Sequence, residues 1–164
     1  MAYAISFIQY ISLLVVCFLG IIFGFIIALI APEELRPGQK YLDKLLKFLV
    51  FLVVILFVIS SVKTYFTLAF LFVVVVLATV LGRRYLQYIY PLLSIILLVA
   101  SKSQTLLVIE ASLIFLTGLV MSSLYMVGFE NSEKIVGSKA NILCKLILRN
   151  ALFFVVGLLF YTFG

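Results

Sequence analysis

Long uninterrupted runs of apolar residues make up most of the chain, and short polar stretches separate them. Two of these runs read FLVFLVVILFVISSV and LAFLFVVVVLATVLG, without alternation between apolar and polar positions. A membrane β-barrel needs alternating strands of about ten residues, whereas continuous apolar length favours helices that cross a membrane. The pattern therefore predicts an all-α integral membrane protein.

The polar stretches divide the apolar runs into six predicted membrane helices that form one domain, a six-helix transmembrane bundle over 1–164. One helix over 48–82 would be about 50 Å long, which exceeds a hydrocarbon core of about 30 Å. We therefore expect a hairpin tip at the polar residues 60–64. The predicted spans are 4–30, 44–62, 65–82, 86–101, 105–128 and 142–163.

The fourth span is the shortest, and a re-entrant segment is the alternative interpretation of it. Tyr85, Tyr88 and Tyr90 lie near its start, just before Pro91. Aromatic residues gather where a membrane helix meets water. These tyrosines are therefore predicted to form an interfacial belt.

Composition agrees with a bilayer environment. The 164 residues are 66% hydrophobic and 11% charged, and the mean hydropathy is +1.39. Soluble domains contain about 45–50% apolar and about 25% charged residues. A water-soluble fold of this composition would have too little polar surface to cover itself, so backbone polar groups must be satisfied within helices in lipid.

Basic residues gather in alternate loops, which orients the predicted bundle. Ten lysines and arginines lie between spans one and two, between spans three and four, and around the start of span six. On the other side are Lys63 and Lys102. Because cytoplasmic loops are rich in lysine and arginine, we expect both termini on the non-cytoplasmic side. The same bias of the cytoplasmic loops explains the net charge of +6. We therefore do not expect nucleic acid as a partner.

The polar stretch APEELRPGQKYLDK follows the first span and is predicted to be cytoplasmic. Pro32 is expected to end the first helix, and Pro37-Gly38 to form a turn. Asp43 and Lys47 have the i,i+4 spacing of an ion pair on a helix.

Two interpretations of this basic side remain open. In the first, the basic side chains lie among anionic lipid headgroups, and each cation near the membrane surface contributes about 1 kcal/mol of attraction. In the second, they form a docking surface together with Glu33 and Glu34. The predicted lipid or partner contacts are Arg36, Lys40, Lys44, Lys47, Arg83, Arg84, Lys145 and Arg149.

Glu110 is the acidic residue within a predicted span, and Thr117 and Tyr125 share its helix face. Ionisable groups inside membranes are costly and commonly mark ion or proton pathways. Glu110 is therefore a candidate proton or cation site facing a cavity. The alternative is a protonated or hydrogen-bonded side chain, or one near the outer interface. A depth difference of about 15 Å argues against a direct bridge to Arg149.

Small residues recur every four positions in the first span, at Gly20, Gly24 and Ala28. Such a seam lets another helix approach closely. We expect its partner to be a helix of this chain, with a second copy as the alternative.

The residue types needed for common cofactor and metal chemistry are sparse. Histidine and tryptophan are absent, and Cys17 and Cys144 are expected to be unpaired. The sequence contains no phosphate-binding glycine loop, zinc-ligand cluster, Cys-x-x-Cys or serine–histidine pair. We therefore expect neither a cofactor nor a metal ion.

Three function classes follow, in descending order of expectation. The first is a non-catalytic subunit or scaffold of a membrane assembly. The second is a transporter or channel for a small solute, ion or proton that uses Glu110. The third is a lipid-modifying enzyme. The expected partners are the bilayer, with anionic headgroups on the cytoplasmic side, and further copies of the chain or other membrane subunits.

Overall fold

The computed structural model describes residues 6–60, 83–101, 103–130 and 139–163. Within these ranges the chain forms helices joined by short turns, and no strand is present. The predicted all-α fold is therefore confirmed. The helices are α1 (Phe7–Ile30), α2 (Pro32–Ser60), α4 (Arg83–Ala100), α5 (Gln104–Glu130), α6 (Lys139–Asn150) and α7 (Leu152–Phe163).

Three helical stretches in the described part of the chain are long and apolar enough to cross a membrane. They are Phe7–Ile30, Gln104–Met126 and Asn141–Leu159. By length and composition they are compatible with a membrane protein. The predicted span 65–82 and nearly all of the hairpin tip at 60–64 lie outside the described residues.

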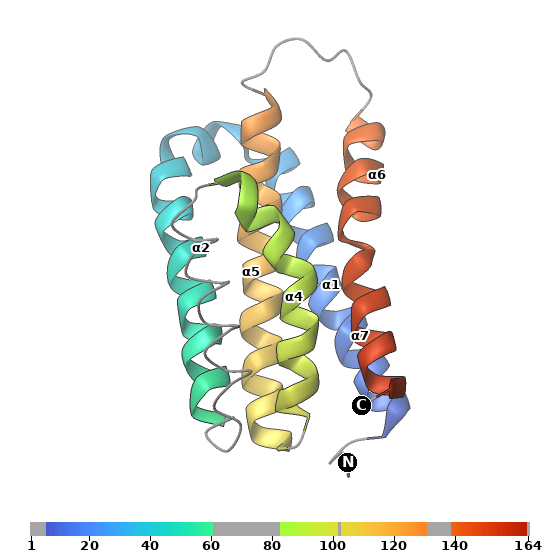
Figure 1. The fold of residues 1–164 in the computed structure, drawn as a ribbon. Helices are drawn as coiled ribbons and strands as arrows, with labels where there is room; N and C mark the ends of the chain where they lie inside the picture. The colour runs from blue at the N-terminus through green and yellow to red at the C-terminus, as the bar shows by residue number, and fades with distance from the viewer. Residues whose placement is uncertain (1–5, 61–82, 102, 131–138, 164) are drawn as a thin grey trace.

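The described helices lie side by side in one bundle, with α5 at its centre (Figure 1). α5 packs against α1, α2 and α4, and α7 packs mainly against α4. α1 and α5 run upward in Figure 1, whereas α2, α4 and the α6–α7 pair run downward. α2 and α4 therefore have the same direction.

The outer surface of the bundle is apolar as well as its core. Large hydrophobic side chains are exposed along α1, α2, α5 and α7 at helical spacing. An apolar outer surface of this extent is the surface that lipid tails would cover. Examples are Ile8, Val15, Phe23 and Ile30 on α1, Phe48, Phe51 and Ile55 on α2, and Leu152, Val155 and Leu159 on α7.

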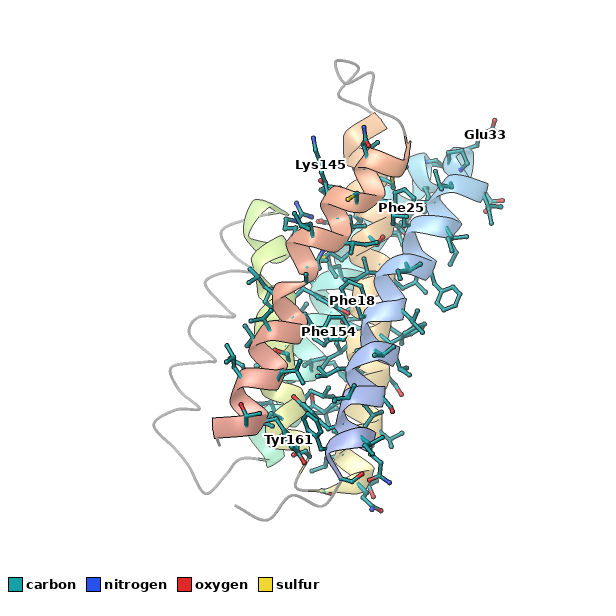
Figure 2. The ribbon with its side chains drawn as sticks, turned by 90° about the vertical axis from the view of Figure 1, so that its right-hand side faces the viewer. Phe18, Phe25, Glu33, Lys145, Phe154 and Tyr161 are labelled. Atoms are coloured by element: carbon teal, nitrogen blue, oxygen red, sulfur yellow. The ribbon has the colours of Figure 1, made fainter. Side chains whose placement is uncertain are left out.

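A column of aromatic side chains joins α1 to α7. The rings of Tyr10 and Tyr161 stack with centroids 4.8 Å apart. One level higher, Phe18 and Phe154 lie 4.8 Å apart, and Figure 2 shows both between the two helices. The hydroxyl of Tyr10 also donates to the carbonyl of Ser94 at 3.4 Å. These contacts set the register of α1 against α4 and α7, both of which run antiparallel to it.

The start of α2 corrects one prediction. α2 begins at Pro32 and continues through Pro37 and Gly38, so the predicted turn at Pro37-Gly38 is wrong. Proline fits a first helical turn because the N–H group that it lacks would have no partner there. Glu33 and Glu34 in that turn also complement the helix dipole. In Figure 1 the first turns of α2 cross the top of the bundle before the helix descends, which agrees with a kink at an internal proline.

The last predicted helix is also interrupted. The prediction was one helix over 142–163, but α6 ends at Asn150 and α7 begins at Leu152, with a turn at Ala151. The N–H of Ala151 donates to the carbonyl of Leu148 at 3.3 Å, three residues back rather than four. The break therefore tightens the chain locally while the two helices follow one another along the bundle.

Candidate functional site

The glycines of the predicted seam lie against the backbone of α5. A Cβ atom added to Gly20 would overlap the carbonyl oxygen of Phe115, and one added to Gly24 would overlap that of Leu119. The hydroxyl of Ser123 also donates to the carbonyl of Gly24 at 3.0 Å. The two glycines therefore serve a contact within the chain. Ala28, the third seam residue, is buried.

Glu110 lies on a different side of α5 from this contact. The carbonyl of Ala111 accepts from Cys17 of α1 at 3.5 Å, and Phe115 and Leu119 continue that row at steps of four. Successive residues on a helix are turned by about 100°, so the Glu110 side chain is rotated by about that angle from this row. It is nevertheless completely buried. α2 and α4 are the other described helices that pack on α5.

The carboxyl group of Glu110 is enclosed, with no hydrogen-bond partner in the described part of the chain. Both of its side-chain oxygens are buried, and neither has a hydrogen-bond partner among the residues that the structure describes. An ionised carboxylate in such surroundings would be very unfavourable, which favours the neutral acid. Glu110 is thus a buried ionisable residue whose described neighbours offer its carboxyl group no hydrogen bond.

Thr117 and Tyr125, predicted on the same helix face, do not join Glu110 in one site. The Thr117 hydroxyl donates to the carbonyl of Leu113 in its own helix at 2.7 Å. Tyr125 is fifteen residues from Glu110, or about 22 Å along the helix. The guanidinium carbon of Arg149 lies 4.4 Å from the centre of the Tyr125 ring. Tyr125 therefore belongs to a second polar region, nearer the other end of the bundle.

Tyr90 differs from its predicted role. It is 1% exposed rather than interfacial, and its hydroxyl donates to the carbonyl of Cys17 at 2.8 Å. A Cβ atom added to Gly118 would lie 2.9 Å from that hydroxyl oxygen. The residues around Tyr90 in the sequence are mostly apolar, so they do not indicate which side of the helix faces the protein interior.

The second polar region contains buried groups that were not predicted as site residues. Asn150 donates through Nδ2 to the carbonyl of Leu146 at 2.8 Å, while its Oδ1 atom has no partner among the described residues. The Ser122 hydroxyl, also fully buried, has none there either. Arg149 is half-buried and stacks on Tyr125.

The helix ends with most of the basic residues lie at one end of the bundle. α2, α4 and α6 all start at the top of Figure 1. Figure 2 shows Glu33 and Lys145 at one end and Tyr161 at the other. Asp43 and Lys47 form an ion pair of 3.3 Å. The side chains of Arg36, Arg83 and Arg84 are outside the described set, whereas Lys40, Lys44, Lys47 and Lys145 are exposed. We call this end of the bundle, with the exposed residues Lys40, Lys44, Lys47 and Lys145, the cationic end.

Comparison with known proteins adds nothing to this geometry. No family model, curated protein or solved structure matches the chain. Within the described ranges, no group of three or more histidine, cysteine, aspartate or glutamate side chains could hold a metal ion. The features of the described residues that bear on function are therefore the cationic end and the buried polar groups.

Proposed function

We propose that this chain is a six-span membrane protein that acts as a non-catalytic subunit or scaffold, and that its cationic end docks an acidic partner on the cytoplasmic side. The apolar outer surface supports membrane insertion. The common direction of α2 and α4 supports six spans, because one further crossing between them is then required. Both termini would lie on the non-cytoplasmic side.

The observation that carries this proposal is the gathering of basic helix starts at one end. The first turns of α2 cross that end and present charged side chains from a helical backbone rather than from a turn. Lys40 and Lys44 are exposed there, and Lys145 is exposed on α6. A positively charged surface of this kind favours association with an acidic partner.

The native cysteines provide a test of the orientation. Cys144 is exposed and next to Lys145, whereas Cys17 is buried. A membrane-impermeant maleimide should label Cys144 in sealed inside-out vesicles and leave it unmodified in right-side-out vesicles. Cys17 should react in neither until the protein is unfolded in detergent. Labelling of Cys144 from the outer side would contradict the proposed orientation.

Docking can be tested by removing the exposed cations. The triple variant Lys40→Ser, Lys44→Ser and Lys145→Ser should lose its co-purifying membrane or cytosolic partner in mild detergent, measured by quantitative mass spectrometry. The control changes Lys63 and Lys102 to serine, since the sequence assigns both to the opposite side. The proposal fails if both variants retain the same partners as the unmodified protein.

A second candidate function is the transport of protons or cations through Glu110. The supporting observation is the enclosed carboxyl group, with neither oxygen hydrogen-bonded in the described part of the chain. Membrane proteins retain such groups at a cost in stability, and intramembrane acids commonly bind the transported ion or proton. Transport and docking are compatible in one membrane assembly.

A further inference from the structure

The face of α5 that carries Glu110 reaches one end of the bundle by a short path. Ser103 directly precedes α5 and is half-buried. Leu107 and Glu110 follow it at i+4 and i+7, so the three residues share one face of the helix. From Gln104 to Glu110 the helix rises by about 9 Å, and from Glu110 to Glu130 by about 30 Å. Glu110 is therefore much nearer the end where α5 begins, the lower end in Figure 1 and the proposed non-cytoplasmic side.

Buried apolar side chains close this face on both sides of Glu110, but unequally. Towards the near end, the residue of this face between Glu110 and Ser103 is Leu107, which is 2% exposed. Towards the cationic end the face continues through Ile114, Thr117 and Met121, which are all buried. The path to the near end is thus shorter and has one apolar layer.

The described groups around Glu110 suit a proton rather than a metal cation. Ca²⁺ and Mg²⁺ take about six to eight oxygen ligands, and transporters commonly coordinate Na⁺ with carbonyls of an unwound helix. α5 is continuous through this region, so its carbonyl groups accept the hydrogen bonds of their own helix. The hydroxyls of Ser112 and Thr117 also donate within α5, at 2.8 and 2.7 Å. Two carboxyl oxygens alone do not form a coordination shell, whereas one proton completes a neutral acid.

The charged residues of the neighbouring helices lie toward the cationic end. α1 and α7 contain none. The last charged residue of α2 is Lys47, that of α4 is Arg84 and that of α6 is Arg149, and all three helices start at the cationic end (Figure 1). No charged group within these helices is therefore at the depth of Glu110 to favour an ionised carboxylate.

Two titratable groups of α1 and α4 lie closer to this depth, and both are occupied by backbone carbonyls. The thiol of Cys17 donates to the carbonyl of Ala111 at 3.5 Å. The hydroxyl of Tyr90 donates to the carbonyl of Cys17 at 2.8 Å. As donors, both groups hold their own protons, so neither offsets a charge on Glu110.

We infer that Glu110 is a binding site for a proton and not for a metal cation, and that its proton exchanges with the non-cytoplasmic end past Leu107. This inference rests on the second candidate function and specifies the ion. On release, the carboxyl O–H bond breaks and the proton passes to water that enters past Leu107. The remaining carboxylate takes up a proton by the same route. The longer path beyond Ile114 is closed in this conformation, so a complete transport cycle requires a second one.

Infrared spectroscopy of the full chain in ether-linked phosphatidylcholine, a lipid without carbonyl groups, tests the bound ion. A protonated carboxyl group has a C=O stretching band distinct from that of a carboxylate, and acids exposed to water are ionised at neutral pH. We expect this band at neutral pH, its loss in Glu110→Gln, and no change when K⁺ is replaced by Na⁺ or Mg²⁺ is added. Absence of the band from the unmodified protein, or its loss on addition of any of these cations, would overturn the assignment to a proton.

Deuterium exchange of the same band tests the route. In D₂O the carboxyl proton is replaced by deuterium and the band shifts. Leu107→Ala should speed this exchange severalfold, whereas Ile114→Ala, the matched change on the other side of Glu110, should leave the rate near that of the unmodified protein. If an alanine variant does not fold, Leu107→Val and Ile114→Val provide the same comparison. Equal rates in the two variants, or faster exchange with the change at Ile114 alone, would overturn the route past Leu107.

Flux measurements in reconstituted vesicles separate this inference from transport itself. Proton exchange at Glu110 without proton or cation flux would remove the transport function and leave the proton site. Flux of Na⁺ or K⁺ that depends on Glu110 would support transport and overturn the proton as the bound ion.

Discussion

Gly24→Ala should leave little stably folded protein. The added Cβ would overlap the carbonyl oxygen of Leu119 and lie 2.8 Å from its carbonyl carbon and its Cα atom. These are backbone atoms, so no side chain can rotate to make room, and α1 must move away from α5. Overpacking a core usually costs about 1–3 kcal/mol. We expect the upper end of that range or more, because the separation also breaks the hydrogen bond from Ser123 to Gly24.

Two other glycines serve as controls for this prediction. Gly38 lies in α2 with no atom within 4 Å of an added Cβ, so Gly38→Ala should be neutral or stabilising by up to ~1 kcal/mol. At Gly157 the nearest atoms are the Leu14 methyl groups, at 3.0 and 3.1 Å, so Gly157→Ala should have an intermediate effect. The measurement is the monodisperse yield from mild detergent and the unfolding temperature. Similar unfolding temperatures for Gly24→Ala and Gly38→Ala would show that the α1–α5 contact is not as close as described.

Glu110→Gln should reduce proton or cation flux to the level of protein-free vesicles while the protein stays folded. The amide has nearly the same shape as the neutral acid but cannot release a proton. Reconstituted vesicles with a pH-sensitive dye inside would measure the flux, with Thr117→Val as the control. The Thr117 hydroxyl donates to the carbonyl of Leu113 in its own helix, so its loss should have little effect. Flux at the unmodified rate in Glu110→Gln would remove this function.

Carbodiimides test whether Glu110 is a neutral acid in dry surroundings. They add to protonated carboxyl groups, and an apolar carbodiimide partitions into the bilayer. An apolar carbodiimide should therefore label Glu110, and a water-soluble one should not. Glu33 and Glu34 are exposed and should show the reverse preference, which makes them internal controls in the same mass spectrum. Rapid labelling of Glu110 by the water-soluble reagent would mean that it faces water.

The sequence predicted the long helices well, because polar residues mark where their apolar runs end. The first span was expected at 4–30 and α1 covers Phe7–Ile30, while the fifth was expected at 105–128 and α5 covers Gln104–Glu130. The predicted turn at Pro37-Gly38 is wrong because a helix tolerates an internal proline at the cost of a kink. The turn at Ala151 contains neither proline nor glycine, so no strong local signal marked it.

Predicting the site from sequence was harder, because lipid and protein core are both apolar. Hydropathy identifies a membrane helix but not the side that faces its neighbours. The inward position of Tyr90 and the partner of Gly20 depend on which helices meet, and that information is spread over the whole chain. Glu110 stands out because an acid is rare in such a run, and Asn150 was a weaker candidate for a hydrogen bond to another helix. Ser122 is a weakly polar residue that the pattern does not distinguish from other serines.

The contact between α1 and α5 has a consequence for how the protein is made. The groups joined by the Ser123–Gly24 hydrogen bond are 99 residues apart in the chain. A ribosome adds ~5–20 residues per second, so α1 waits on the order of 5–20 s for its partner to be synthesised. Throughout that interval the face of α1 that carries Gly20 and Gly24 can pack against any other helix nearby. Slow codons before α5 would prolong this exposure, and the rate of translation thereby becomes a determinant of the yield of correctly assembled protein.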